Sequence, residues 1–520
     1  MALLDTYTKP LSTLEVAHLL RRTTFGGRPS ELKSLTGQTA STIVTQLLAA
    51  QPDPNPPTMA DGTTFHDKAW GYPGTDDTTR SSSDGTARNR LKYWWIGQMI
   101  NQPMTITEKM TLFWQNHFVS TNVEVPDARF LYRYLQLMRK YALGNFRSFV
   151  IEVTKDLAML KYLDNDLNTA TKSNENYGRE LQELFTIGLG NYNEDDVKAA
   201  ARTLSGWKTV GYRNATTSAI SVLFTVANHD KTDKQFSSFY QNTVIKGRST
   251  DIAGDDELAD LINMILAQPA TARFIVRKFY RYFVQADISA QIENEVIEPL
   301  AAIFRKNYEI KPVLQALFTS THFYDSALLG SQIKSPLDLI VGTLRSINYQ
   351  VPSPTTDMTT FDAATSYFFA RANEQQMNVL DQPSVFGWRP YYDTDFYEIW
   401  INATTLALRG KLTDTFVKGS TSLKLTFDSI ALATATKTPT DPYAMVTELA
   451  SPLFAFALTT DQIKYLVDTV LMTGSPYYEW TDIWNKYVAS PSVAANKTAV
   501  KTRLDALYTY MFRLAEFQLA

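Results

Sequence analysis

The stretch RFLYRYLQLMRKYAL, residues 129–143, has the spacing that decides the fold. Its apolar side chains recur three and four positions apart, which places them on one face of an α-helix. The same spacing predicts helices over 11–22, 39–50, 88–100, 104–118, 146–163, 174–188, 194–207, 256–266, 270–284, 291–304, 336–347, 396–411, 442–456 and 497–517. The chain is therefore predicted to be mainly α, a multi-helix array.

Three segments lack this period. Residues 51–90 are rich in Pro, Gly, Asp, Ser and Thr and are expected to form a long surface loop. Residues 208–245 alternate apolar and polar side chains and predict a small antiparallel β-meander insert. An irregular zone at 348–364 suggests a division. We expect a large helical region, 1–347, that holds the loop and the insert, and a C-terminal helical region, 348–520, packed on it.

The amino-acid composition excludes several classes of partner and cofactor. Lys and Arg number 50 and Asp and Glu 53, so the net charge of −3 gives no bulk attraction for nucleic acid, and none is expected as a partner. The absence of cysteine excludes thiolate zinc sites, iron–sulfur clusters and disulfides. No run approaches the ~18 apolar residues of a membrane-spanning helix. We predict no resident cofactor, with calcium as the one alternative.

The first residues, MALLDTYTKPL (1–11), lack the basic segment and apolar run of a secretory signal. The cytoplasm is therefore the default expectation, while export stays open because a leader could have been removed.

The segment NENYGRELQELF, residues 174–185, carries the densest set of functional side chains. Glu175, Arg179 and Glu183, with Asn176 and Glu180, fall on one arc of the predicted helix. Carboxylates beside an arginine and an amide can act as acid, base and orienting group. The alternative is a solvated helix face with ion pairs at i, i+4 spacing, and the periodicity alone favours that alternative.

The loop before this helix suggests a calcium site. Asp164, Asp166 and Asn168 occupy positions 1, 3 and 5 of a twelve-residue frame, and Glu175 occupies position 12. Position 6 is Thr169, where the calcium loop needs glycine for its sharp turn. Asx residues also occur in loops and helix caps for local reasons, so both interpretations stay open.

The histidines give weaker signals. His117 shares a helix face with aromatic residues, so a neutral core histidine is the alternative to a catalytic one. The pair His229-Asp230 follows a strand-like run, at a loop position where side chains often do chemistry. No HExxH spacing occurs, so a zinc enzyme is not expected.

Two further patterns indicate ligand contacts. Arg273, Arg277 and Arg281 recur every four residues and form either an anion-gripping stripe or a solvated face. Trp388 and Trp400 frame an aromatic run that could stack on sugars or form a packed loop.

Several motifs together resemble the bacterial domain-of-unknown-function 1800 family. They are AHLLRRTTFG (17–26), KMTLFWQNHF (109–118), NENYGRELQELF (174–185) with Gly206-Trp207, His229-Asp230, and PSVFGW (383–388) with WIN (400–402) and Arg409. The resemblance spans about residues 11–409. It implies a functional surface without naming a reaction, because no activity of the family can be carried over.

The resemblance implies a set of site residues by position. They are Asn116, His117, Asn174, Glu175, Asn176, Arg179, Glu180, Glu183, His229, Asp230, Trp388, Asn402 and Arg409. A solvated helix face would not need a family-wide choice of Asn, Glu and Arg, so the resemblance favours a functional role for Glu180 and Glu183.

We expect the 174–188 helix, the His117 helix and the His229-Asp230 loop to meet at one polar cleft. The leading hypothesis is a hydrolase-like enzyme acting on a carbohydrate or other polymer. Catalysis would use Glu180, Glu183, His117, Arg179, His229 and Asp230, and substrate would contact Asn116, Asn176, Trp388, Asn402 and Arg409. The alternatives are a non-catalytic helical scaffold, such as an export or cell-surface assembly factor bound to a partner protein, and a calcium-stabilised binding protein.

Overall fold

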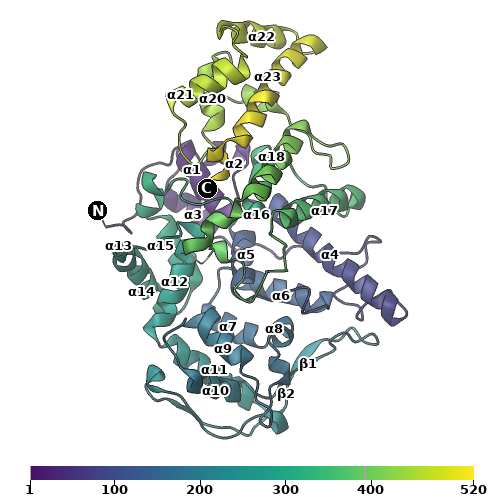
Figure 1. The fold of residues 1–520 in the computed structure, drawn as a ribbon, viewed down its shortest axis with the longest axis vertical. Helices are drawn as coiled ribbons and strands as arrows, with labels where there is room; N and C mark the ends of the chain where they lie inside the picture. Colours follow the sequence, from purple (N-terminus) through teal and green to yellow (C-terminus); the bar gives the residue numbers. More distant parts are fainter. Residues whose placement is uncertain (1, 392–393) are drawn as a thin grey trace.

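The computed structural model describes residues 2–391 and 394–520. Helices make up most of the chain, and the strands are confined to one small insert, as the sequence predicts. In Figure 1 the last helices form one end of an elongated molecule, and α10, α11 and the strands lie at the other end. The earliest helices, with α5 and α12, lie between the two ends.

The secondary structure of the first third of the chain is helical, with a long loop between α3 and α4. Its helices are α1 (Thr13–Thr24), α2 (Pro29–Leu35), α3 (Ala40–Leu47), α4 (Asp77–Asn101), α5 (Thr107–His117), α6 (Ala128–Lys140), α7 (Phe146–Thr154) and α8 (Leu157–Tyr162). The stretch that opened the sequence analysis forms α6, whose apolar face is buried against α5, α4 and α8.

The middle third holds the candidate site and the strands. Its elements are α9 (Asn176–Glu180), α10 (Glu194–Thr203), β1 (Trp207–Val210), β2 (Ser221–Phe224), β3 (Lys234–Gln235), β4 (Val244–Ile245), α11 (Ala253–Leu266), α12 (Pro269–Phe283), α13 (Ala290–Ile292), α14 (Glu298–Arg305), α15 (Ile310–Phe318) and α16 (Pro336–Ser346).

The last third packs on the first. Its helices are α17 (Met358–Glu374), α18 (Ala403–Lys418), α19 (Ser429–Thr434), α20 (Pro442–Ala450), α21 (Thr460–Tyr465), α22 (Tyr478–Ala489) and α23 (Ala494–Arg513). Helix α17 lies along α4, and α18 contacts both α16 and α23. The division of the chain at 347/348 stays a prediction.

The β insert differs from a single meander. β1 pairs antiparallel with β2, with Trp207 opposite Phe224, and β3 pairs antiparallel with β4, with Lys234 opposite Ile245. The two hairpins are separate two-stranded sheets. Residues between them fold into a short 3₁₀ turn at Val226–Asn228 that ends at His229.

The loop predicted over 51–90 ends earlier than expected, because α4 begins at Asp77. Asp76 caps the helix by accepting from the Thr79 amide, and Thr79 completes a capping box. The first turns of α4 are polar and exposed, so they lack the apolar period from which helices are predicted.

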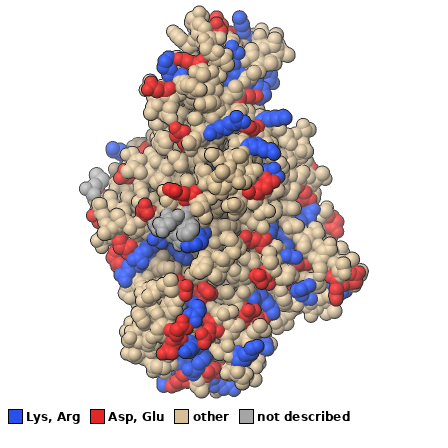
Figure 2. Space-filling model, in the orientation of Figure 1, with Lys and Arg blue, Asp and Glu red and all other residues tan. Residues whose placement is uncertain are grey.

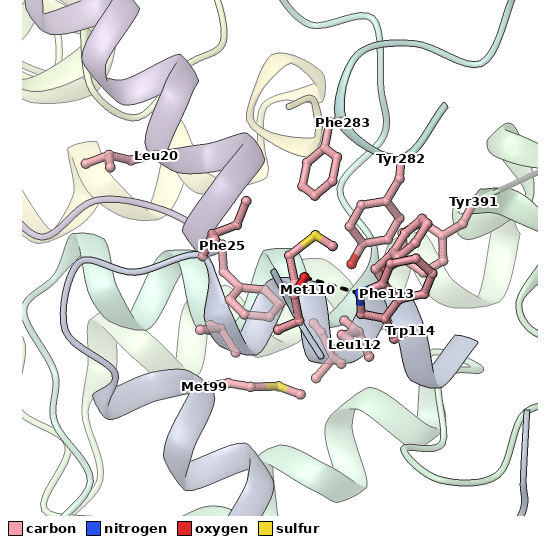
Figure 3. Close-up of a cluster of buried hydrophobic side chains, with 14 of the residues drawn as sticks. Leu20, Phe25, Met99, Met110, Leu112, Phe113, Trp114, Tyr282, Phe283 and Tyr391 are labelled. Carbon is pink, nitrogen blue, oxygen red and sulfur yellow. Dashed lines mark hydrogen bonds between the residues drawn. The ribbon is translucent and has the colours of Figure 1, made fainter. Parts of the chain in front are cut away.

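The core is one continuous apolar cluster centred on α5. Trp114 lies against Phe146 and Phe149 of α7 and Phe279 of α12. Figure 3 shows Phe25 and Met110 side by side, with Tyr282, Phe283 and Tyr391 across from them. This packing fixes the end of α5, where His117 lies, against α12.

The surface carries mixed charge. Figure 2 shows Lys and Arg side chains interspersed with Asp and Glu on the face drawn, so neither sign dominates there. Over the residues that the structure describes, no helix combines the length and the apolar character that crossing a bilayer requires.

Candidate functional site

The signature segment NENYGRELQELF forms a short α-helix that widens into a π-helix. Helix α9 covers Asn176–Glu180, and the π-helical turn covers Leu181–Thr186. Gly178 lies where α9 crosses α10, and a Cβ there would come 3.0 Å from the Ala201 amide nitrogen. π-Helical turns inside helices occur frequently at functional sites.

Glu180 and Glu183 are two of the three half-buried carboxylates of this segment, and Glu175 is the third. Burial raises the pKa of Glu180 to about 7, and the nearby charge of Glu183 adds to the rise. Glu183 accepts a hydrogen bond of 2.6 Å from the Tyr192 hydroxyl. Burial, with the charges of Glu124 and Glu180, raises the pKa of Tyr162 to about 12. The four groups therefore form a patch in which one carboxyl, that of Glu180, is part protonated near neutral pH.

Arg179 forms its ion pairs with two other carboxylates, Glu194 and Glu175. Its guanidinium donates two hydrogen bonds of 2.7 Å to Glu194 on α10, and Glu175 lies 3.7 Å away. The Glu194 hydrogen bonds hold the pKa of Arg179 above its usual value. Asn176 is exposed at the start of α9, and its backbone amide donates to Asn174. Both ion-pair partners of Arg179 are carboxylates of the protein, and its role in catalysis stays a prediction.

His117 caps the far end of the same segment. Its Nε2 lies 3.0 Å from the Phe185 carbonyl oxygen, which can only accept, so Nε2 carries the proton. Lys278 of α12 lies 3.1 Å from the other ring nitrogen, and it donates to the Leu184 carbonyl at 3.0 Å. Burial, reinforced by the Lys278 charge, lowers the pKa of His117 well below its usual value. His117 is therefore a neutral buried group that satisfies a helix-terminal carbonyl.

His229 and Asp230 belong to a separate network. The His229 ring is fully buried between the Ser205 carbonyl, 2.9 Å away, and Glu257 Oε1, 3.1 Å away. Glu257 also pairs with buried Lys234. Although burial opposes ionisation, the hydrogen bonds from His229 and Lys234 lower the pKa of Glu257. Asp230 pairs with Arg202 at 2.7 Å.

We expected the signature helix, the His117 helix and the His229-Asp230 loop to meet at one cleft. Only the first two are in direct contact there. His117 touches the end of the signature segment, whereas His229 and Asp230 hold the hairpin region to α10 and α11. Neither Glu180 nor Glu183 lines any of the five cavities described for this structure. The surface patch around Glu180 and Glu183 remains the candidate site. The His117 and His229 networks hold the elements around it in place.

Two of the four predicted calcium ligands, Asp166 and Asn168, have close protein partners. Lys161 pairs with Asp166 at 2.5 Å, and Asn168 donates to the Ala201 carbonyl at 2.7 Å and accepts from the Asn174 amide. Asp164 takes a left-handed backbone conformation with φ of 54°. Across 2–391 and 394–520, no three His, Cys, Asp or Glu side chains gather where they could hold a metal ion. Calcium binding by this segment stays a prediction.

Four of the five predicted substrate-contacting residues, all except Asn176, lie outside the signature segment. Asn116 is buried, and its Oδ1 accepts from the Trp388 backbone amide at 2.6 Å. Asn402 caps α18 by accepting from the amides of Thr404 and Thr405. Arg409 is fully buried and donates to the Lys334 carbonyl at 2.8 Å. These residues fix the C-terminal helices onto the core, and Trp388 is buried at 3% exposure rather than open for stacking.

The structure also brings together several charged residues that were not predicted as site residues from the sequence. Arg21 and Arg22, from the AHLLRRTTFG motif, and Lys109, from the motif of α5, line a common cavity with Asp338. The sequence does contain a hint of this cluster: two adjacent arginines interrupt an otherwise apolar helical stretch. On a surface helix such arginines would point into water.

The fold places the protein among mainly α-helical proteins with a small β insert. The fold by itself does not name a reaction. The chain belongs to the family described as protein of unknown function (DUF1800), whose model matches residues 18–519. A search of curated proteins found no match, and neither did a search of solved structures.

Proposed function

We propose that this protein is an enzyme that cleaves a substrate by acid–base catalysis at Glu180 and Glu183. The observation that carries the proposal is a pair of neighbouring half-buried carboxyls with different environments. Burial and the Glu183 charge raise the pKa of Glu180 to about 7, so it is part protonated at neutral pH. A general acid works best when its pKa lies near the working pH.

The two carboxyls would take different roles. Glu180 donates its proton to the leaving-group oxygen as the bond to that oxygen breaks. Glu183, whose carboxylate accepts from the Tyr192 hydroxyl, assists the attacking water by taking its proton. The balance is hydrolysis, with water supplying one hydrogen to each product. The raised pKa of Glu180 suits the role of general acid, and the hydrogen bond from Tyr192 orients the carboxylate of Glu183.

Aromatic rings beside the carboxyls favour a carbohydrate or another extended polymer as substrate. Tyr192 contacts Glu183 directly, and Tyr162 lies close enough to Glu180 for the carboxylate charge to raise its pKa. Ring faces next to a polar group suit the apolar face and hydroxyl edge of a sugar.

A non-catalytic scaffold is the second candidate, favoured by the polar side chains that hold backbone groups around the signature segment. Gln182 is fully buried, donates to the Gly178 and Asp196 carbonyls, and accepts from the Tyr240 hydroxyl. His117 similarly satisfies Phe185. Satisfied networks of this kind can specify helix register without doing chemistry.

A hydrolysis screen of glycosides, esters and peptides separates these candidates. We expect wild type to cleave one class and Glu180→Gln to reduce kcat by about 10²–10⁴-fold, the usual contribution of a general acid. Because the acid form is active, kcat/KM should fall as pH rises through about 7, the pKa of Glu180. Glu175→Gln is the matched control, because Glu175 is another part-buried carboxylate of the segment and its nearest cation is Arg179.

Circular dichroism and melting temperature must first show that both variants fold. Equal activity of wild type and Glu180→Gln on a cleaved substrate would refute the proposed role of Glu180. The scaffold candidate gains if wild type cleaves no class in the panel.

A further inference from the structure

Four cationic side chains line a small cavity between α1, α5, α12 and α16, together with apolar, aromatic and polar residues. It measures about 30 Å³, and its lining includes Arg21, Arg22, Lys109, Arg281 and Asp338, with half-buried Tyr397 at its rim. Among the described lining residues, Asp338 supplies the one side-chain carboxylate. A single water needs about 10–15 Å³ by the same measure, so the space exceeds that of one water molecule.

Arg21 and Arg22 are buried with part of their hydrogen-bonding capacity unused. Arg21 is 5% exposed and Arg22 2%. The Nη2 of Arg21 donates to the Phe454 carbonyl at 2.9 Å, and the Nη2 of Arg22 donates to Ser331 Oγ at 3.2 Å. Nη1 of Arg21, and both Nη1 and Nε of Arg22, have no acceptor in the part of the chain that the structure describes. Buried, unpaired guanidinium nitrogens are costly unless an acceptor binds them.

The remaining charges do not neutralise this pair. Asp338 forms its ion pair with Lys109, whose ammonium also lies 4.8 Å from the Phe25 ring centroid and 5.2 Å from that of Tyr282. These two rings belong to the cluster in Figure 3. Lys334 and Arg409 are buried near the same carboxylate. Among the described residues, two carboxylates, that of Asp338 and the terminal carboxylate of Ala520 in the cavity lining, therefore stand among five buried cations.

We propose that this cavity binds an oxyanion the size of phosphate or sulfate, held by Arg21 and Arg22. Guanidinium groups suit such a ligand because their N–H donors match oxyanion geometry, whereas an ammonium acts as a point charge. The anion is either a free ion or the charged end of a larger ligand that passes the rim at Tyr397. This proposal does not depend on Glu180 or Glu183, which lie outside the cavity.

The test measures binding of inorganic phosphate, inorganic sulfate and glucose 6-phosphate by calorimetry at constant ionic strength, with glucose and chloride as blanks. We expect saturable binding of the oxyanions by wild type, and a melting temperature that rises with their concentration but not with chloride. Glucose 6-phosphate distinguishes the sources: tighter binding than inorganic phosphate indicates a larger ligand, and equal or weaker binding indicates the free ion.

Variants locate the site. Arg22→Gln should weaken oxyanion binding about tenfold or more, as expected for the loss of a charge-assisted contact. Arg273→Gln is the matched control on α12, because Arg273 is part exposed and pairs with Glu298 at 3.2 Å. It should change affinity by less than about twofold, since an exposed charge is screened by salt.

Two results would overturn the proposal: wild type that binds none of the three oxyanions saturably, or an equal loss of affinity in Arg22→Gln and Arg273→Gln. If Arg22→Gln fails to fold, wild-type crystals soaked in selenate decide the question. An anomalous peak between Arg21 and Arg22 supports the site, and a cavity without a peak at saturating selenate rejects it.

Discussion

Replacing Asp338 by asparagine is expected to destabilise the protein by about 3–5 kcal/mol, the usual cost of removing one partner from a buried ion pair. Asp338 pairs with Lys109 through one oxygen and accepts from the Ser335 hydroxyl at 2.8 Å through the other. Asparagine keeps the shape but removes the charge. Lys109 and its buried cationic neighbours then face one another without compensation.

Thermal unfolding with and without 50–100 mM phosphate, on the order of concentrations that saturate weak anion sites, measures this effect. Phosphate should restore part of the lost melting temperature, because an anion bound by Arg21 and Arg22 replaces the missing negative charge. Asp505→Asn is the control, since its ion pair with Lys501 is half exposed. An Asp338→Asn protein that melts with wild type would mean that the buried cations do not depend on this carboxylate.

The substitution Glu257→Gln is expected to have an effect of similar size, about 3–5 kcal/mol. Glu257 on α11 has no exposed side-chain surface and holds three groups. They are the His229 ring at 3.1 Å, the buried Lys234 ammonium, and the Arg248 backbone amide at 2.7 Å. The neutral amide leaves the Lys234 charge buried without a carboxylate.

The same network predicts a pH dependence. Although burial opposes it, the pKa of Glu257 is lowered in the folded protein from its ordinary 4.5, so ionised Glu257 stabilises the fold. That contribution is fully present above pH 4.5 and is lost as pH falls through the lower, folded-state pKa. Urea titrations of wild type and Glu257→Gln across this range should converge as pH falls.

A double variant, Lys234→Met with Glu257→Leu, removes both charges and is the control. It should recover much of the lost stability, because an apolar replacement of a buried pair is often neutral. A Glu257→Gln protein as stable as wild type at pH 7 would contradict a buried ionic network at His229.

The helical fold could be predicted because most helices bury one face, and that face imposes a period on the sequence. Helix α6 shows this directly, with nine of its residues buried. The first turns of α4 could not be predicted in this way, since they project into solvent and are specified by the Asp76 cap instead. The sequence predicts one meander where the structure has two separate hairpins. The alternation of apolar and polar side chains indicates strands but not which strands pair.

The candidate site was predictable only in part. The Glu180 and Glu183 carboxyls lie on one helical segment, so helical spacing alone places them together. The role of His117 depends on Phe185 and Lys278, which are distant in sequence. The cationic cavity joins α1, α5, α12 and α16, and the adjacent arginines in the apolar stretch of α1 do not reveal which distant helices they meet.

A general acid at Glu180 must be part protonated near neutral pH, and carbon-13 NMR titration of its side-chain carboxyl measures this protonation. We expect an apparent pKa of about 7 for Glu180 in wild type. The pKa of Glu180 should be lower in Glu183→Gln, because the neighbouring negative charge is gone. A wild-type value near 4.5, the ordinary pKa of glutamate, would contradict the claim and leave no general acid on this helix.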